Sequence, residues 1–195
     1  MNTVLYNSSG YQELTIDGLL QSKRMIYIEG EINDELAMKV TKKMTQLTQE
    51  DPLEPVKIFI NSGGGSIDAG MVIYDIIQSA PMSIKLYCTG KAYSMAAVLF
   101  ASGQHGRYLL PHSKVMIHEP LIPYGVGGKT SSVQTIASDL LKTKEEMIKI
   151  LSKHTGQTLK KLRTITKNDA FYKGEEAVKF GLADEVIGFD KMMEA

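Results

Sequence analysis

Short apolar runs alternate with longer amphipathic stretches along most of the chain. The runs that predict strands are Met25–Ile28, Val56–Ile60, Ile84–Cys88, Arg107–Leu110 and Lys114–Ile117. Strands that alternate with helical stretches are typical of an α/β fold, in which repeated βαβ units build a parallel sheet covered by helices. Because we find neither an internal repeat nor a linker, the pattern predicts one α/β domain over residues 1–195.

Apolar residues between the strands recur every three or four positions, which is the period of a helix. The first predicted helix has an apolar face that consists of Leu36, Val40, Met44 and Leu47. Its predicted N-cap is Asn33 or Asp34. Further helices are predicted over Ile67–Ser79 and Met95–Ala101. A short helix over Glu175–Phe180 is predicted to end at Gly181, because glycine suits the left-handed position after a helix.

A glycine-rich stretch, Gly125–Gly128, precedes the longest amphipathic region of the chain. Its spacing predicts a helix of about 20 residues over Ser132–Lys153, longer than the average of ~11–12 residues. A helix of this length either covers the sheet or projects to pack on another subunit, and the pattern favours neither alternative.

The composition is that of an ordinary globular protein. The chain has 195 residues, of which 43% are hydrophobic and 23% charged, and its 22 basic residues balance its 22 acidic residues. These values exclude a disordered or collagen-like chain. Without a basic excess we expect no nucleic-acid partner. Zero net charge also removes the self-repulsion that opposes self-association.

The single cysteine and the N-terminus indicate where the protein works. Cys88 has no partner for an internal disulfide and lies in a predicted strand, so we interpret it as a core thiol. Residues 1–10 lack the charged and apolar segments of a secretory signal, and no apolar run is long enough to span a bilayer. We therefore expect a cytoplasmic protein without a membrane partner.

Three consecutive glycines, Gly63–Gly65, follow a predicted strand and precede a helix, where phosphate-binding loops lie. A dinucleotide loop would need a further glycine at the position of Asp68. The sequence Gly128–Thr130 lacks the upstream glycine of a P-loop, because Pro123 stands there. The triple glycine is thus either a tight turn or a loop whose backbone N–H groups form an oxyanion hole or bind an extended peptide.

Ser94 stands where a strand ends and a helix of small residues begins. Its side chain is either an N-cap or a nucleophile whose oxyanion the following N–H groups would stabilise. Ala92 and Ala96 replace the glycines of a Gly-x-Ser-x-Gly elbow, so that motif is absent.

A serine nucleophile needs a base, and His118 follows an apolar strand at the sheet edge where α/β sites collect. A structural role for this histidine is the alternative. The base in turn needs a carboxylate to orient it, and spacing does not choose among the downstream candidates. These candidates are Asp139, Glu145, Glu146, Asp169, Glu175 and Asp184.

Five segments in order resemble the ClpP family, the proteolytic subunits of the Clp protease, from about Leu19 to Ile187. They are "INSGGGSIDAGMVIYD", "GKAYSMAAVLFASG", "LPHSKVMIHEP", "HTGQTL" and "FYKGEEAVKFGLADEVI". The resemblance implies the ClpP/crotonase-like fold with a protruding handle over about residues 125–153, in which 125–128 are a strand-turn segment lining the substrate groove. It also implies an N-terminal axial segment over residues 1–18.

The resemblance further implies a serine endopeptidase with Ser94 as nucleophile, His118 as base and Asp169 as its carboxylate. The backbone N–H groups of Gly65 and Met95 would form the oxyanion hole. Gly64, together with Gly65, would pair with an extended substrate backbone. No metal or cofactor is implied for this chain.

ClpP-like subunits are similar in assembling as two stacked heptameric rings that enclose the active sites. An AAA+ unfoldase uses ATP to deliver unfolded polypeptides, so the expected partners are this unfoldase, the polypeptide substrate and further copies of the chain.

Three departures from the family pattern bear on assembly. Lys167 and Asn168 stand where family members usually have an acidic residue and an arginine that link the rings, so we predict a weaker double ring. Lys57 replaces a tyrosine of the unfoldase-docking pocket, although Phe59 keeps the neighbouring aromatic position. Residues 1–19 lack the usual pore-loop sequence.

Two alternatives follow. One is a latent or scaffold paralogue that works in mixed rings with another ClpP. The other is a crotonase-like CoA-thioester enzyme of similar fold, which the combination of Ser94, His118 and Asp169 disfavours because enolate chemistry needs a carboxylate base and no serine nucleophile.

Overall fold

The computed structural model describes residues 2–7, 10–122 and 125–194, and a seven-stranded sheet forms its centre. Five strands run parallel in the order β3 (Met25–Ile32), β4 (Val56–Gly65), β5 (Ile84–Tyr93), β6 (Arg107–Leu109) and β9 (Glu185–Val186). Near its end β5 also pairs in parallel with β7 (Lys114–Ile117), and β8 (Ala170–Lys173) pairs antiparallel with β7. The predicted α/β class is therefore confirmed.

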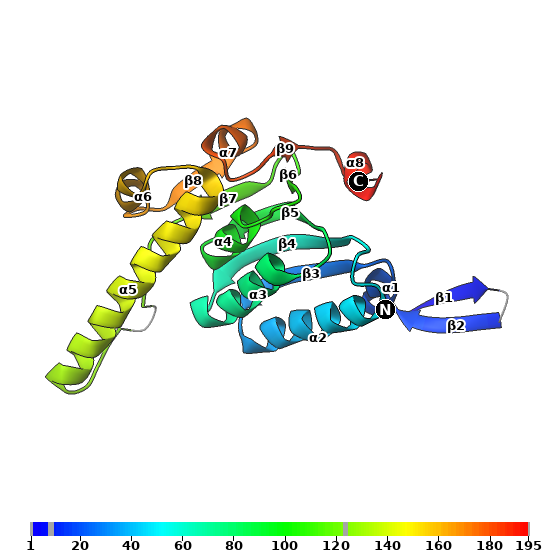
Figure 1. The fold of residues 1–195 in the computed structure, drawn as a ribbon, viewed down its shortest axis with the longest axis horizontal. Coiled ribbons are helices and arrows are strands. Elements are labelled where there is room, and N and C mark those ends of the chain that lie inside the picture. Colours follow the sequence, from blue (N-terminus) through cyan, green and yellow to red (C-terminus); the bar gives the residue numbers. More distant parts are fainter. Residues whose placement is uncertain (1, 8–9, 123–124, 195) are drawn as a thin grey trace.

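Three helices pack against one face of this sheet, as Figure 1 shows: α2 (Asp34–Glu50), α3 (Ile67–Ser79) and α4 (Met95–Ala101). The core between them is aliphatic and includes Ile26, Ile58, Ile60 and Leu86, all fully buried. Asn33 caps α2, because its side chain accepts the Leu36 N–H at 2.9 Å. Cys88 is buried in the same core, where loss of solvation raises the pKa of its thiol to about 11.

Aromatic rings cover the opposite face of the sheet. Tyr27, Phe59, Tyr87 and Tyr108 occupy matching positions on β3 to β6, and their neighbouring rings stack at 4.8 to 5.1 Å between centroids. The C-terminal helix α8 (Phe189–Glu194) adds the buried Met192 to this cluster. Lys57 lies at its edge, where its Nζ donates a hydrogen bond to the Met193 carbonyl at 3.1 Å.

Helix α5 (Thr130–Thr155) is the long amphipathic helix, and its first half projects away from the sheet (Figure 1). Its buried residues all lie in the last third: Met147, Ile148, Leu151 and Thr155. The helix runs 26 residues and is longer at both ends than the predicted Ser132–Lys153. It ends at Gly156, which has a left-handed φ of 70°.

Two short helices follow α5, namely α6 (Leu159–Ile165) and α7 (Glu175–Phe180). The structure confirms the bounds of α7 and its left-handed Gly181. The prediction of a strand within 125–128 is wrong, since these residues have no regular secondary structure. A glycine-rich sequence offers few side chains to pack against a neighbouring strand.

The N-terminus forms an antiparallel pair, β1 (Asn2–Asn7) with β2 (Gly10–Thr15), followed by α1 (Ile16–Ser22). Figure 1 shows this pair extending from the end of the molecule opposite to α5. Over the described part of the chain, no helix combines the length and apolar character that crossing a membrane requires.

Candidate active site

Ser94 holds an unusual backbone conformation between β5 and α4. Its φ of 56° and ψ of −125° lie in a region that residues with a side chain rarely adopt. Hydrogen bonds hold it there, because the Ser94 N–H donates to the Met116 carbonyl at 2.8 Å and the Ser94 carbonyl accepts from Ala97 at 2.9 Å. The side chain makes no capping hydrogen bond, so the N-cap interpretation of Ser94 is wrong.

The triple-glycine loop at the end of β4 lies directly against Ser94. A Cβ on Gly64 would stand 2.6 Å from the Tyr93 carbonyl oxygen and 2.7 Å from Ser94 Cβ. Ser62 orders this loop, because its Oγ donates to the Gly30 carbonyl at 2.6 Å and accepts the Gly64 N–H at 3.0 Å. The sequence analysis did not single out Ser62, although it directly precedes the glycines.

Two backbone N–H groups lie at this junction. Met95 is the first residue of α4, so its N–H has no acceptor within the helix. Gly65 is exposed at the end of β4 and has a φ of 148°. The Gly64 N–H is already bound to the Ser62 hydroxyl.

The pairing of β7 with β8 brings His118 and Asp169 together. In this antiparallel register Ile117 lies opposite Ala170, so the next pair outward is His118 and Asp169. His118 Nδ1 and Asp169 Oδ1 are 3.8 Å apart, which is longer than a hydrogen bond. The histidine side chain is 13% exposed and the aspartate side chain 60% exposed.

Other carboxylates among the six candidates have different partners. Glu145 forms a 2.6 Å ion pair with Arg163. Asp184 holds Arg107, whose Nη2 lies 2.5 Å from Asp184 Oδ1. Among the six candidates, Asp169 is the one for which the structure records a contact with His118.

Ser94 and His118 line one small cavity of about 30 Å³. The structure records no hydrogen bond between these two side chains, both of which it describes. The remaining walls are apolar, contributed by Ile67, Met95, Val98, Ile117, Pro120, Met147 and Leu151. A cavity of this size has room for about one water molecule, so these apolar residues are packed core beside the serine and the histidine.

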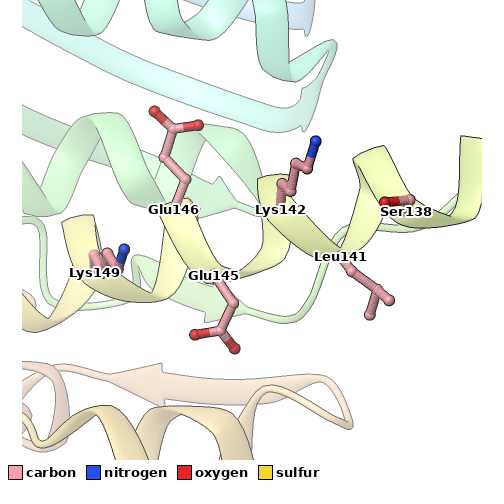
Figure 2. A pocket seen from close by; sticks show the side chains of 6 residues that line it. All are labelled: Ser138, Leu141, Lys142, Glu145, Glu146 and Lys149. Atoms are coloured by element: carbon pink, nitrogen blue, oxygen red, sulfur yellow. The ribbon is translucent and has the colours of Figure 1, made fainter. Parts of the chain in front are cut away.

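A larger hollow, of about 640 Å³, lies elsewhere and is formed by residues of α5 (Figure 2). Leu141 and Glu145 point to one side of the helix, whereas Lys142 and Glu146 point to the other. Such an arrangement is open helix surface, not an enclosed site. Within the described ranges, no three His, Cys, Asp or Glu side chains form a group suited to a metal ion.

The mostly parallel sheet, with Ser94 and His118 near the ends of β5 and β7, defines a protein of the α/β class. Residues 8–190 match the family model of the Clp protease. The chain is also 38% identical to the ATP-dependent Clp protease proteolytic subunit 2 of Corynebacterium efficiens over 180 aligned residues. The alignment covers 92% of this chain and 89% of that protein. The chain belongs to the Clp protease family.

This result confirms the resemblance inferred from the five sequence segments and agrees with the α/β architecture. Membership of the family makes the chain a peptidase subunit. It also implies an oligomeric assembly and a Clp-type ATPase as partner.

Proposed function

We propose that the chain is a serine endopeptidase subunit that cleaves unfolded polypeptides, with Ser94, His118 and Asp169 as its catalytic residues. The observation that carries this proposal is the backbone of Ser94. A φ of 56° at a residue with a side chain is costly, and it places a serine without a capping role on the cavity that His118 shares. Such strain is characteristic of nucleophiles at strand-to-helix turns.

The reaction begins when Ser94 Oγ attacks a peptide carbonyl carbon while its proton passes to His118. The C–N bond then breaks as the imidazolium returns that proton to the leaving amine. Water attacks the acyl-enzyme with His118 again as base, which releases the acid and restores the Ser94 hydroxyl. Asp169 stabilises the imidazolium, and we expect its 3.8 Å separation from His118 to shorten to hydrogen-bond length in the reacting form.

The backbone supplies the oxyanion hole and the substrate groove. The N–H groups of Met95 and Gly65 would stabilise the negative oxygen of the tetrahedral intermediate. Gly64 and Gly65 would align the substrate as an added strand. This chemistry needs no metal or cofactor in the chain.

The assembly we propose is that of the family: two stacked heptameric rings, with an AAA+ unfoldase that uses ATP to deliver substrate. A second candidate is a latent subunit that becomes active in mixed rings with another ClpP. The open 3.8 Å separation between His118 and Asp169 favours this candidate for the isolated chain.

Labelling with a fluorophosphonate, combined with hydrolysis of fluorogenic peptides, tests the proposal. Wild-type protein should be labelled at Ser94, and Ser94→Ala should lose the label and at least about 10³-fold in kcat. Asp169→Asn should keep the label but react about tenfold or more slowly. Hydrolysis by Ser94→Ala at the wild-type rate would refute the assignment.

The same assay separates the alternatives. Labelling that requires a second ClpP-type subunit identifies the latent form. Absence of labelling in every mixture, together with turnover of a CoA thioester, identifies a crotonase-like enzyme.

A further inference from the structure

An ion pair connects the projecting helix α5 to the residue after His118. Lys144 Nζ contacts Glu119 Oε2, and the side chains are 24% and 37% exposed. The Glu119 Oε2 atom itself is buried. A partly buried pair between two elements fixes their relative position more firmly than an exposed pair would, because water competes less for the charges.

Lys144 lies on the face of α5 that points toward the candidate active site. Met147 and Leu151 follow it by three and seven residues, so the three side chains share one face of the helix. Both Met147 and Leu151 line the cavity that contains Ser94 and His118. The same helical face therefore forms a wall of the cavity and holds Glu119.

Glu119 also connects the histidine to the segment that carries Asp169. Its backbone N–H donates to the Thr166 carbonyl at 2.8 Å. Thr166 is 1% exposed, and its Oγ1 donates to the Leu162 carbonyl of α6 at 2.8 Å. Asp169 follows Thr166 by three residues, so Glu119 joins α5, the end of β7 and the approach to β8.

We propose that Lys144 and Glu119 are a positioning pair that holds His118 beside Asp169. Neither side chain lines the cavity, so the pair acts through the histidine and not on the substrate. Because the first half of α5 projects from the domain, the pair also couples the placement of this helix to the alignment of the site. This inference rests on the proposed roles of Ser94, His118 and Asp169.

The test compares Lys144→Met with Lys142→Met, which is the same change at an exposed position two residues away on α5. Lys144→Met should lower kcat and the rate of fluorophosphonate labelling at Ser94 about tenfold, with KM unchanged. Lys142→Met should behave as wild type. Lys144→Arg preserves the charge and should recover most of the activity.

A charge exchange provides the second measurement. Glu119→Lys and Lys144→Glu should each slow labelling about tenfold, and the double variant should recover at least about threefold over either single variant. The exchange also keeps the inference testable if Lys144→Met does not fold. Unchanged kcat in a folded Lys144→Met protein, or no recovery in the double variant, would overturn it.

The outcomes also separate this inference from the proposed function. If wild-type protein is not labelled at Ser94, alone or with a second subunit, the proposed function fails. If wild type is labelled and the Lys144 variants react at the same rate, the positioning role alone fails.

Discussion

At the scale of single residues, Gly64 determines how closely β4 approaches the serine. Its φ of +92° belongs to the region that favours glycine, and its Cα faces Tyr93 and Ser94 without room for a further atom. Gly63 differs, because a Cβ there would meet only Lys91 Nζ, at 4.0 Å. The two neighbouring glycines thus form a matched pair for mutagenesis.

Gly64→Ala should disturb the site more than the fold. The added methyl group must move β4 away from Ser94, so we expect labelling at Ser94 to fall at least about tenfold and the free energy of unfolding to fall by about 2 kcal/mol. Gly63→Ala should change the free energy of unfolding by about 0.5 kcal/mol or less. Urea denaturation and labelling kinetics measure both effects. Equal behaviour of the two variants would contradict this account of the loop.

Sequence reasoning reached the site residues unequally. Ser94 and His118 could be selected as candidates because each directly follows a recognisable strand, β5 or β7. In an α/β fold the ends of such strands are where sites collect. Asp169 could be named only through the family resemblance, because its place beside His118 depends on the register between β7 and β8, and β8 has only four residues. The strained φ of Ser94 is a property of the packed structure and leaves no signal in the sequence.

At the scale of elements, the end of α5 is attached to the core through a half-buried histidine. Tyr74 Oη lies 3.0 Å from His154 Nε2, which joins α3 to the last turn of α5. Partial burial, together with the positive charges of Lys153 and Arg107, lowers the pKa of His154 to about 4. The histidine is therefore neutral in the folded protein at neutral pH.

This lowered pKa makes the contact between His154 and Tyr74 sensitive to acid. The unfolded chain binds a proton near pH 6.5 and the folded chain only near pH 4, so stability is lost as the pH falls from about 6.5 to about 4. In His154→Gln this contribution is absent, and the fall in stability over the same window should be shallower. Urea denaturation at about pH 7.5 and about pH 5 measures the slope. The control is His112→Gln at an exposed position, which should keep the wild-type slope.

Elements with several apolar positions were predictable, and those with few were not. The bounds of α3, α4 and α7 agree with the sequence prediction residue by residue. Helices α6 and α8 and strands β8 and β9 each bury at most one side chain, which is too little to mark an element, whereas the equally short α4 and α7 bury seven and two. The β1–β2 pair was also missed, because its polar sequence lacks the regular alternation of a half-buried strand.

At the scale of the whole molecule, the sheet buries both of its faces, but in different ways. Helices α2 to α4 cover one face, while on the other the aromatic rings pack with Met192 of α8. The resemblance implies unfoldase docking at Lys57 and Phe59. Lys57 donates a hydrogen bond to the Met193 carbonyl of α8, and Phe59 belongs to the same cluster as Met192 of α8. The placement of this terminal helix was not predictable from six residues with one buried side chain.

The surface near Lys167 bears on the prediction of a weak double ring. Lys167 lines a hollow of about 380 Å³ with Lys144, Lys160 and Arg163. Lys144 is paired with Glu119 and Arg163 with Glu145, so Lys160 and Lys167 are the lining cations for which the structure records no ion pair among the described residues. If two rings meet through this region, a two-fold contact brings like charges together, since each copy presents the same patch. An acidic residue followed by an arginine would instead pair with its counterpart across the two-fold axis.

We therefore predict that dilution separates the proposed assembly into single heptamers or smaller species, as sedimentation velocity would show. The double variant Lys167→Asp with Asn168→Arg restores the family pattern and should shift the population toward the fourteen-subunit species at the same concentration. Lys179→Ala on α7 changes the net charge by the same amount and should leave the distribution unchanged. A wild-type double ring that persists through dilution and high salt would contradict the prediction, because paired rings would then be held by contacts other than residues 167 and 168.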